Sequence, residues 1–313
     1  MLIALGGNAM TSPDGRAGPE DQQAAIALAM EEVAGIVAAG VQVLLTHGNG
    51  PQVGNLLVKN EIAANVVPPV PLDWCGAQTQ GTIGLLIMNA LESSLASRGV
   101  TTSQPAVLVS RTLVRADDPH FADPSKPIGR YLPADEAAKM IEHGQIWKDM
   151  GAKGWRRVVA SPEPVECLDA AAAHTLLDAG YTVVCAGGGG VPVTRDEAGV
   201  LSGVEAVIDK DLTAALLGRQ LGADTLLIAT DVKAVMTGWG TAQERPLGAV
   251  SVAELRALAA RGEFGSGSMG PKVEAACRFA DGGGRAIITH LAAIDEALAG
   301  RAGTVVTLGD TPD

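Results

Sequence analysis

The sequence predicts an α/β fold of three layers, in which an open, mainly parallel β-sheet lies between helices on both faces. Short apolar runs alternate along the chain with helical patterns of ten or more residues, as parallel strands and crossover helices do. Hydrophobic residues make up 47% of the 313 positions, which is enough for a large core. Glycine clusters follow several apolar runs, at the strand ends where such sheets bind ligands.

The predicted strands are the short apolar runs, and they cover Met1–Leu5, Val41–Thr46, Val107–Ser110, Tyr181–Ala186, Asp224–Thr230, Ala286–Thr289 and Thr304–Leu308. The predicted helices cover Gln22–Ala39, a segment opened by Pro51, Thr79–Ser97, Ala170–Ala179, Asp211–Leu221, Val252–Arg261 and Pro271–Ala280. Glycine suits the left-handed turn that ends a helix, and Gly40, Gly99, Gly180 and Gly222 follow four of these patterns directly or closely. Proline at position 51 suits a first helical turn.

Composition and charge exclude several classes of function. The net charge is −12 and aromatic residues are only 3% of the chain, so we expect no nucleic-acid partner. No apolar run approaches the ~20 residues of a membrane span, and no signal peptide is evident, so we expect a cytoplasmic protein without a membrane partner. The four cysteines form no CxxC pair or zinc spacing, which favours buried free thiols (Cys75, Cys167, Cys185 and Cys277).

Residues 115–164 depart from the alternation of strands and helices. They contain half of the eight lysines and two of the four tryptophans. Prolines are spread through the stretch at Pro119, Pro124, Pro127, Pro133, Pro162 and Pro164. We expect a small subdomain that protrudes from the sheet. A long surface loop is the alternative, although loops of this length without structure are uncommon.

Known nucleotide-binding motifs give limited guidance. The GxxxxGK[ST] pattern is absent, and Gly265–Gly270 matches GxGxxG but follows a predicted helix where a dinucleotide fold requires a strand. We therefore reject NAD binding. Pro271 opens the next helix, and Lys272 in its first turn opposes the helix dipole unless an anion binds there. An ordinary solvated lysine is the alternative.

Three glycine loops fall at the same predicted edge of the sheet: Gly6-Gly7-Asn8, His47-Gly48-Asn49-Gly50 and Gly187–Gly190. Such loops let the backbone approach a small anion closely, although turn chemistry explains any one of them. His47 is expected to be structural. Two further lysines have unusual contexts: Lys210 lies between Asp209 and Asp211 before a helix, and Lys126 lies between Pro124 and Pro127. A surface ion pair and an exposed loop lysine are the alternatives.

These residues resemble those of the carbamate kinases, within the amino-acid kinase superfamily, along nearly the whole chain. The matching segments are Ala4–Ala9, Thr46–Asn55, Pro71–Asp73, Ser125–Gly129, Gly154–Val159, Gly187–Val193, Gly203–Asp211 and Gly267–Lys272. Acetylglutamate kinase and its relatives typically carry a lysine where this chain has Asn8. The resemblance therefore points to carbamate kinase within the superfamily.

The resemblance implies a sheet of about eight strands and one amino-acid kinase domain over residues 1–313, with 115–164 as an inserted subdomain. It also implies assembly into a homodimer. The implied reaction transfers the γ-phosphoryl group of MgATP to carbamate, giving carbamoyl phosphate and ADP. In reverse it would form ATP during breakdown of arginine or of purines and allantoin. Magnesium would arrive with the nucleotide, and no protein side chain is expected to bind it.

The resemblance also implies roles for individual residues. The implied catalytic residues are Lys126, Lys210, Asp211 and Lys272. The implied carbamate contacts are Gly6, Gly7, Asn8, Gly48, Asn49 and Gly50. The implied nucleotide contacts are Lys210, Asp231, Val235, Met236, Met269 and Lys272. The chain departs from the family at Arg130, where proline is usual, and at Met236, where tyrosine is frequent.

Two other functions remain open from the sequence. One is a kinase of the same fold that phosphorylates another small acid, a phosphonate or a phosphate, for which a changed acceptor loop would be the signature. The other is a catalytically silent relative that binds a nucleotide or an amino acid as a sensor. Loss of Lys210, Asp211 or Lys272 would favour the sensor, and all three residues are present.

Overall fold

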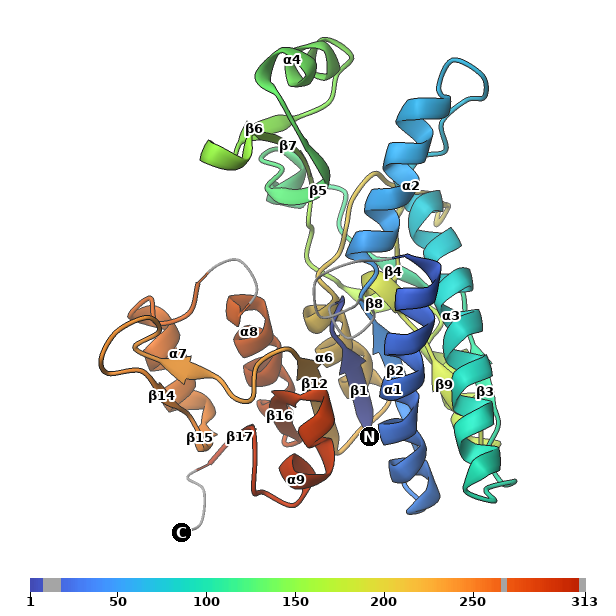
Figure 1. Ribbon diagram of the computed structural model, residues 1–313, viewed down its shortest axis with the longest axis vertical. Helices are drawn as coiled ribbons and strands as arrows, with labels where there is room; N and C mark the ends of the chain where they lie inside the picture. Colours follow the sequence, from blue (N-terminus) through green and yellow to red (C-terminus); the bar gives the residue numbers. More distant parts are fainter. Residues whose placement is uncertain (8–17, 266–268, 310–313) are drawn as a thin grey trace.

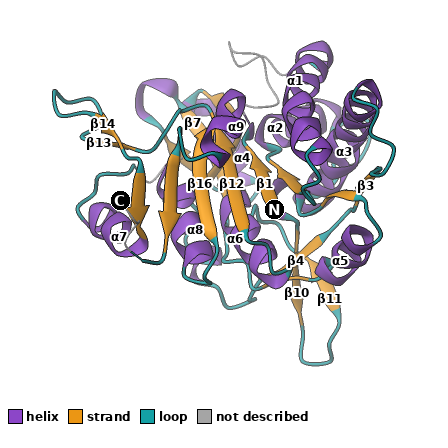
Figure 2. Ribbon diagram, turned by 90° about the horizontal axis from the view of Figure 1, so that it is seen from below, coloured by secondary structure: helices purple, strands orange, loops and turns teal. Residues whose placement is uncertain are grey.

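The central feature of the fold is one eight-stranded sheet, several strands of which lie side by side in Figure 2. The computed structural model describes residues 1–7, 18–265 and 269–309. In spatial order the strands are β15 (Ala249–Ser251), β17 (Thr304–Thr307), β16 (Arg285–His290), β12 (Thr225–Thr230), β1 (Leu2–Leu5), β2 (Leu44–His47), β9 (Thr182–Val184) and β3 (Pro105–Val107). All neighbours pair in parallel except β16 and β17, which pair antiparallel. The predicted, mainly parallel sheet is confirmed.

Helices cover both faces of this sheet (Figure 2). Alternate residues along β1 decide which face each side chain enters: Ile3 and Leu5 pack with α1, α3 and α9, whereas Leu2 and Ala4 pack with α5, α6, α7 and α8. The helices are α1 (Pro19–Ala38), α2 (Gly50–Ala63), α3 (Leu72–Ser97), α4 (Ala134–Glu142), α5 (Ala170–Asp178), α6 (Lys210–Gln220), α7 (Val252–Ala260), α8 (Met269–Ala280) and α9 (Ile294–Leu298). The three-layer prediction is therefore confirmed.

Smaller sheets lie beside the central one. A four-stranded sheet has the order β11 (Leu201–Gly203), β10 (Val191–Arg195), β4 (Arg111–Leu113) and β8 (Glu166–Cys167). The pair β13 (Met236–Thr237) and β14 (Arg245–Pro246) forms a hairpin. Single 3-10 turns are η2 (Pro119–Phe121), η3 (Gly151–Lys153), η4 (Gly187–Gly189) and η5 (Leu291–Ala293).

A three-stranded sheet, the small sheet, protrudes beside α2 at the top of Figure 1 and packs on this helix through Ile128 and Val159. Its order is β5 (Lys126–Leu132), β7 (Trp155–Val159) and β6 (Trp147–Asp149), and α4 packs on it through a small core of Leu132, Ala137 and Trp147. All of these elements fall inside the range 115–164. The division of the chain into one domain with a subdomain over 115–164 stays a prediction.

Several element bounds differ from those predicted. The helix predicted over Thr79–Ser97 begins earlier, at Leu72, after an extended Pro71. The helix predicted from Pro271 begins at Met269. The strand predicted over Val107–Ser110 ends at Val107, because the Ser110 backbone binds the Gln80 side chain.

Two general predictions concern membranes and thiols. Among the described helices, including the 26-residue α3, none combines the length and apolar character that crossing a membrane requires. All four cysteines are buried and free, as predicted.

Candidate active site

The loops after β1 and β2 are bound together at the carboxyl edge of the sheet. The Gly48 amide donates to the Leu5 carbonyl over 3.0 Å, and the Gly6 amide donates to the Ala229 carbonyl over 2.9 Å. A Cβ atom on Gly48 would lie only 2.9 Å from the Gly7 amide nitrogen, so glycine is required at position 48. The structure therefore brings the predicted carbamate-binding loops together, while Asn8 lies outside the described residues.

The Gly187–Gly190 loop joins them from the end of β9. A Cβ atom on Gly188 would lie 2.1 Å from Nδ2 of Asn49, and Gly188 also has a φ of +68°. The Asn49 side chain is held from the other side, where its Nδ2 donates to Oγ1 of Thr79 over 2.9 Å. All three predicted glycine loops therefore meet at one place, with Asn49 between two of them.

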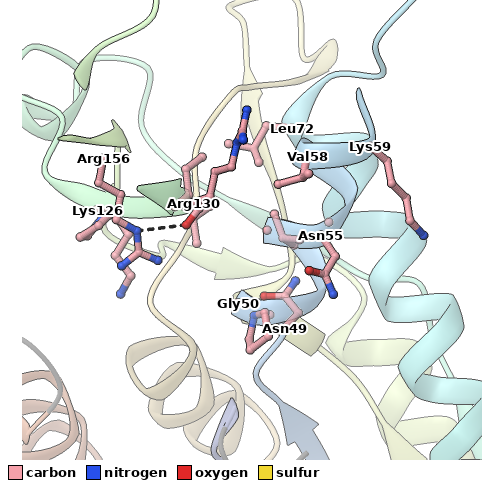
Figure 3. Close-up of a pocket in the computed structure, with 18 of the residues that line it drawn as sticks. Asn49, Gly50, Asn55, Val58, Lys59, Leu72, Lys126, Arg130 and Arg156 are labelled. Atoms are coloured by element: carbon pink, nitrogen blue, oxygen red, sulfur yellow. Dashed lines mark hydrogen bonds between the residues drawn. The ribbon is translucent and has the colours of Figure 1, made fainter. Parts of the chain in front are cut away.

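A cavity of about 1100 Å³ opens above these loops (Figure 3). Asn49 and Gly50 line it at the start of α2, and Gly188 and Gly190 line it from the loop after β9. Lys126 and other basic side chains of the small sheet form the facing wall in Figure 3. The cavity thus lies between the glycine loops of the main body and the small sheet.

The cluster of Lys210, Asp211 and Lys272 lies at the start of α6. Asp211 is 3% exposed, and its carboxylate accepts from Nζ of Lys210 and, over 3.0 Å, from Nζ of Lys272. Burial alone would raise the pKa of Asp211, but the two ammonium groups outweigh it and hold the pKa below its usual value. Asp211 therefore stays ionised and holds two lysines together that are distant in sequence.

Asp209 connects this cluster to the small sheet. It caps α6 by accepting from the amides of Asp211 and Leu212, at 2.9 and 3.3 Å. Its other carboxylate oxygen accepts from Nζ of Lys126 over 3.0 Å. Asp209 is thus the N-cap of α6, and Asp211 lies in the first turn of the helix. Three lysines and two aspartates thus leave one excess positive charge, suited to an anionic ligand.

His47 is not placed to act as a base. Its side chain is 1% exposed, and burial lowers its pKa to about 4, so the ring is neutral at pH 7. Nδ1 lies 2.9 Å from the Gly48 carbonyl oxygen, and the neutral ring donates to it. The expected structural role of His47 agrees with this geometry.

Comparison with known proteins decides the family. The amino acid kinase family profile matches residues 1–290. A carbamate kinase of Pyrococcus furiosus is 42% identical over 310 residues, which cover 98% of each chain. The chain belongs to the carbamate kinases of the amino acid kinase family. The predicted resemblance is confirmed, and the protein is a kinase.

Two further carbamate kinase relatives are similar to this chain over nearly its whole length. The structure of carbamate kinase from Giardia lamblia bound to AMP-PNP superposes with a TM-score of 0.91. It is 39% identical, and the match covers 98% of this chain and 97% of that one. A carbamate kinase-like protein of Escherichia coli is 40% identical over 311 residues, covering 98% of each chain.

The nucleotide contacts expected for a carbamate kinase come from the elements beyond β12. Asp231 directly follows β12, Met236 is half-buried in β13, and Met269 is the first residue of α8. Val235 is fully buried in the core against which Met269 packs, and its amide and carbonyl already bond to Thr304 and Leu247. The roles of these residues stay predictions.

The donor set of this kinase fits magnesium only together with a nucleotide. Both carboxylate oxygens of Asp211 accept from lysines, and Asp209 is engaged by Lys126 and backbone amides. Among the described residues no group of three or more His, Cys, Asp or Glu side chains could hold a metal. Magnesium commonly keeps its waters and binds substrate phosphates, so this lysine-rich site suits a metal brought by the nucleotide.

Proposed function

We propose that this chain is a carbamate kinase that transfers a phosphoryl group reversibly between MgATP and carbamate, forming carbamoyl phosphate and ADP. The observation that carries the proposal is the Asp211 carboxylate, which holds Lys210 and Lys272 together at the start of α6, the helix that contacts β1, β2 and the Gly187–Gly190 loop. The carbamate kinase relatives support it. We further propose that the reaction forms ATP in arginine or purine and allantoin catabolism, in the cytoplasm.

In this proposal carbamate lies against the backbones of Gly6, Gly7, Gly48 and Gly50, beside the Asn49 side chain, with Asn8 adjoining. Its attacking oxygen is already anionic, so no general base is needed. This agrees with His47 being buried and neutral. The barrier is then lowered by positioning and by neutralising charge on the transferring group, as in other phosphoryl transfers.

The lysines supply the neutralising charge. Asp211 fixes Lys210 and Lys272 on the main body, and Lys126 of the small sheet reaches Asp209 at the start of α6. Magnesium, when bound with the nucleotide, neutralises further phosphate charge. Nucleotide contacts are proposed for Asp231, Val235, Met236 and Met269, in addition to Lys210 and Lys272.

A coupled assay in the ATP-forming direction tests the proposed function. We expect purified protein to form ATP from carbamoyl phosphate and MgADP, detected through hexokinase. The variant Lys210→Ala should lower turnover at least ~100-fold, because one fixed positive charge is lost from the site. Absence of ATP formation by the folded wild type would contradict the proposal. A screen of small acids with MgATP would then test the alternative acceptors.

We also propose a homodimer that forms through α3. Trp74 and Leu85 are 61% and 51% exposed and lie three helical turns apart, on the same side of α3. Ile62 and Val66, near the end of α2, are also exposed. Apolar side chains gathered on one face commonly mark an interface.

We expect light scattering after size exclusion to give the mass of a dimer for the wild type. The double variant Trp74→Glu/Leu85→Glu should give the mass of a monomer, because dimer formation would bury two charges in the interface. Trp239→Glu is the matched control, since Trp239 is 67% exposed but lies on the β13–β14 hairpin. A monomeric wild type, or a dimeric double variant, would reject this interface.

A further inference from the structure

Ala186 adopts a strained backbone conformation directly before the Gly187–Gly190 loop. Its φ and ψ are +54° and +34°, in the left-handed region, and it is the one non-glycine residue with positive φ in the described part of the chain. An L-residue pays about 1–2 kcal/mol for this conformation. Strain of this kind persists only where the surroundings fix it, and it concentrates at functional sites.

Two buried side chains, one from β2 and one from the segment between β3 and β4, fix Ala186 itself. Its amide donates to Oγ of Ser110 over 2.7 Å, and its carbonyl accepts from Oγ1 of Thr46 over 2.8 Å. Ser110 and Thr46 are 2% and 0% exposed. Both polar groups of the strained residue are therefore engaged from within the core.

Gln80 of α3 connects this arrangement to the glycine loop. It is 1% exposed, and its Nε2 donates to the carbonyls of Gly187 and Ser110 over 2.9 and 3.1 Å. Its Oε1 accepts from the Ser110 amide over 2.7 Å. One buried amide thus binds the loop and also the residue that holds Ala186.

The direction of these bonds matters for an anion site. The carbonyl oxygens of Ala186, Gly187 and Gly189 accept from Thr46, Gln80 and Thr213, which are all at most 1% exposed. These carbonyl dipoles are therefore turned into the core, while Gly188 and Gly190 line the cavity. An anion in the cavity is spared repulsion from the three oxygens.

We propose that Gln80 is a positioning residue for the phosphoryl acceptor. Together with Ser110, it holds Ala186 in the left-handed conformation and so fixes the Gly187–Gly190 loop against Asn49. This inference rests on the proposed function for the identity of the acceptor. Gln80 touches no reacting atom in this account. It acts through the loop, on the acceptor side of the site and away from the proposed nucleotide contacts.

Steady-state kinetics of Gln80→Leu, alone and combined with Ala186→Gly, test the proposal. We expect Gln80→Leu to lower kcat/KM for carbamoyl phosphate about 10- to 100-fold, because the loop is misplaced. The KM for MgADP should stay within about twofold, because no nucleotide contact changes. Adding Ala186→Gly to Gln80→Leu should raise kcat/KM for carbamoyl phosphate at least about fivefold again, because glycine adopts positive φ without strain. A general loss of stability would produce neither the selectivity nor the rescue.

Ser251→Ala is the control for stability. Ser251 is buried and caps α7 at the opposite edge of the sheet from β9, so its loss destabilises the fold without touching the loop. If Gln80→Leu does not fold, Ser110→Ala takes its place, because it removes the Ser110 hydroxyl that bonds to the Ala186 amide and to the Cys185 thiol. A folded variant with kcat/KM for carbamoyl phosphate within threefold of the wild type would overturn the proposal. So would absence of rescue by glycine.

Amide hydrogen exchange tests whether Gln80 holds the Gly187–Gly190 loop, whatever reaction the protein catalyses. We expect Gln80→Leu to speed exchange at Gly189, Gly190 and Val191, whose amides bond to Ala186, Gly187 and Ser110 in the wild type. Ser251→Ala should leave exchange there unchanged. If the wild type makes no ATP from carbamoyl phosphate, the proposed function fails, while exchange still decides whether Gln80 holds the loop. Unchanged exchange in Gln80→Leu would overturn the inference.

Discussion

Replacing Asp211 with asparagine is expected to lower turnover about 1000-fold and the free energy of unfolding by about 3–5 kcal/mol. The side chains of Asp211, Lys210 and Lys272 are 5, 12 and 13% exposed, so water screens them poorly. Asparagine would leave two buried ammonium groups close together without a counter-charge. The two lysines would then separate and could no longer both bind one phosphoryl group. Stopped or coupled assays measure turnover, and urea unfolding at pH 7 measures the free energy of unfolding.

The pH dependence of this variant follows from the lowered pKa of Asp211. A carboxylate with a pKa depressed by folding contributes stability above its unfolded value of 3.8, and this contribution is lost as the pH falls through the folded pKa. The difference in unfolding free energy between wild type and Asp211→Asn should therefore be constant from pH 5 to 8. It should shrink only below about pH 3.8.

A surface carboxylate supplies the control. Asp117 pairs with Arg115, but both side chains are about 70% exposed, so Asp117→Asn should change neither turnover nor stability measurably. Bound nucleotide should also reduce the difference in unfolding free energy between the wild type and Asp211→Asn, because its phosphates supply the missing negative charge. Turnover of Asp211→Asn within tenfold of the wild type would exclude Asp211 from the mechanism.

The sequence was sufficient for the sheet and its glycine loops because those signals are local. Apolar runs, helix stops and glycine clusters lie within a few residues of the elements they specify, and parallel strands bring their carboxyl ends together. The pairing of Asp211 with Lys272 joins residues far apart in the chain, so spacing alone could not reveal it. The resemblance to a family indicated instead that both residues are catalytic.

The positions that sequence reasoning missed have side chains with no unusual local context. Gln80 lies in a helix, Ala186 is an alanine that adopts a conformation typical of glycine, and Asp209 was one of two aspartates beside Lys210. Each acquires its role from partners that only the tertiary fold provides. Short strands such as β4 and β10 were missed for the same reason, because their pairing across the chain stabilises them more than their own residues do.

Lys126 tests whether the small sheet contributes to the reaction. The bulge between Ile128 and Tyr131 and the Arg130 bond to Glu61, 3.2 Å long, seat β5 on α2, beside the cavity. From that position Nζ of Lys126 reaches Asp209 at the start of α6. The departure from the family at Arg130 thus adds a contact between β5 and α2 and leaves Lys126 at the site.

We expect Lys126→Ala to lower kcat about 100- to 1000-fold, because a positive charge facing the transferring phosphoryl group is removed. The KM for MgADP should change less than threefold, since the proposed nucleotide contacts lie on other elements. The melting temperature should change little, because the Lys126 side chain is 34% exposed and its ion pair is worth at most about 1 kcal/mol. ATP-forming kinetics at saturating carbamoyl phosphate measure the effect.

Lys148→Ala is the matched control, because it removes a lysine that pairs with Asp123 over 3.0 Å on the same small sheet. Equal losses in both variants would mean that the charge of the small sheet as a whole matters, and not one ammonium group at the reacting atoms. Wild-type kcat in folded Lys126→Ala would remove the small sheet from the chemistry. Loss confined to Lys126→Ala would instead assign the effect to the one ammonium group that already reaches Asp209 at the start of α6.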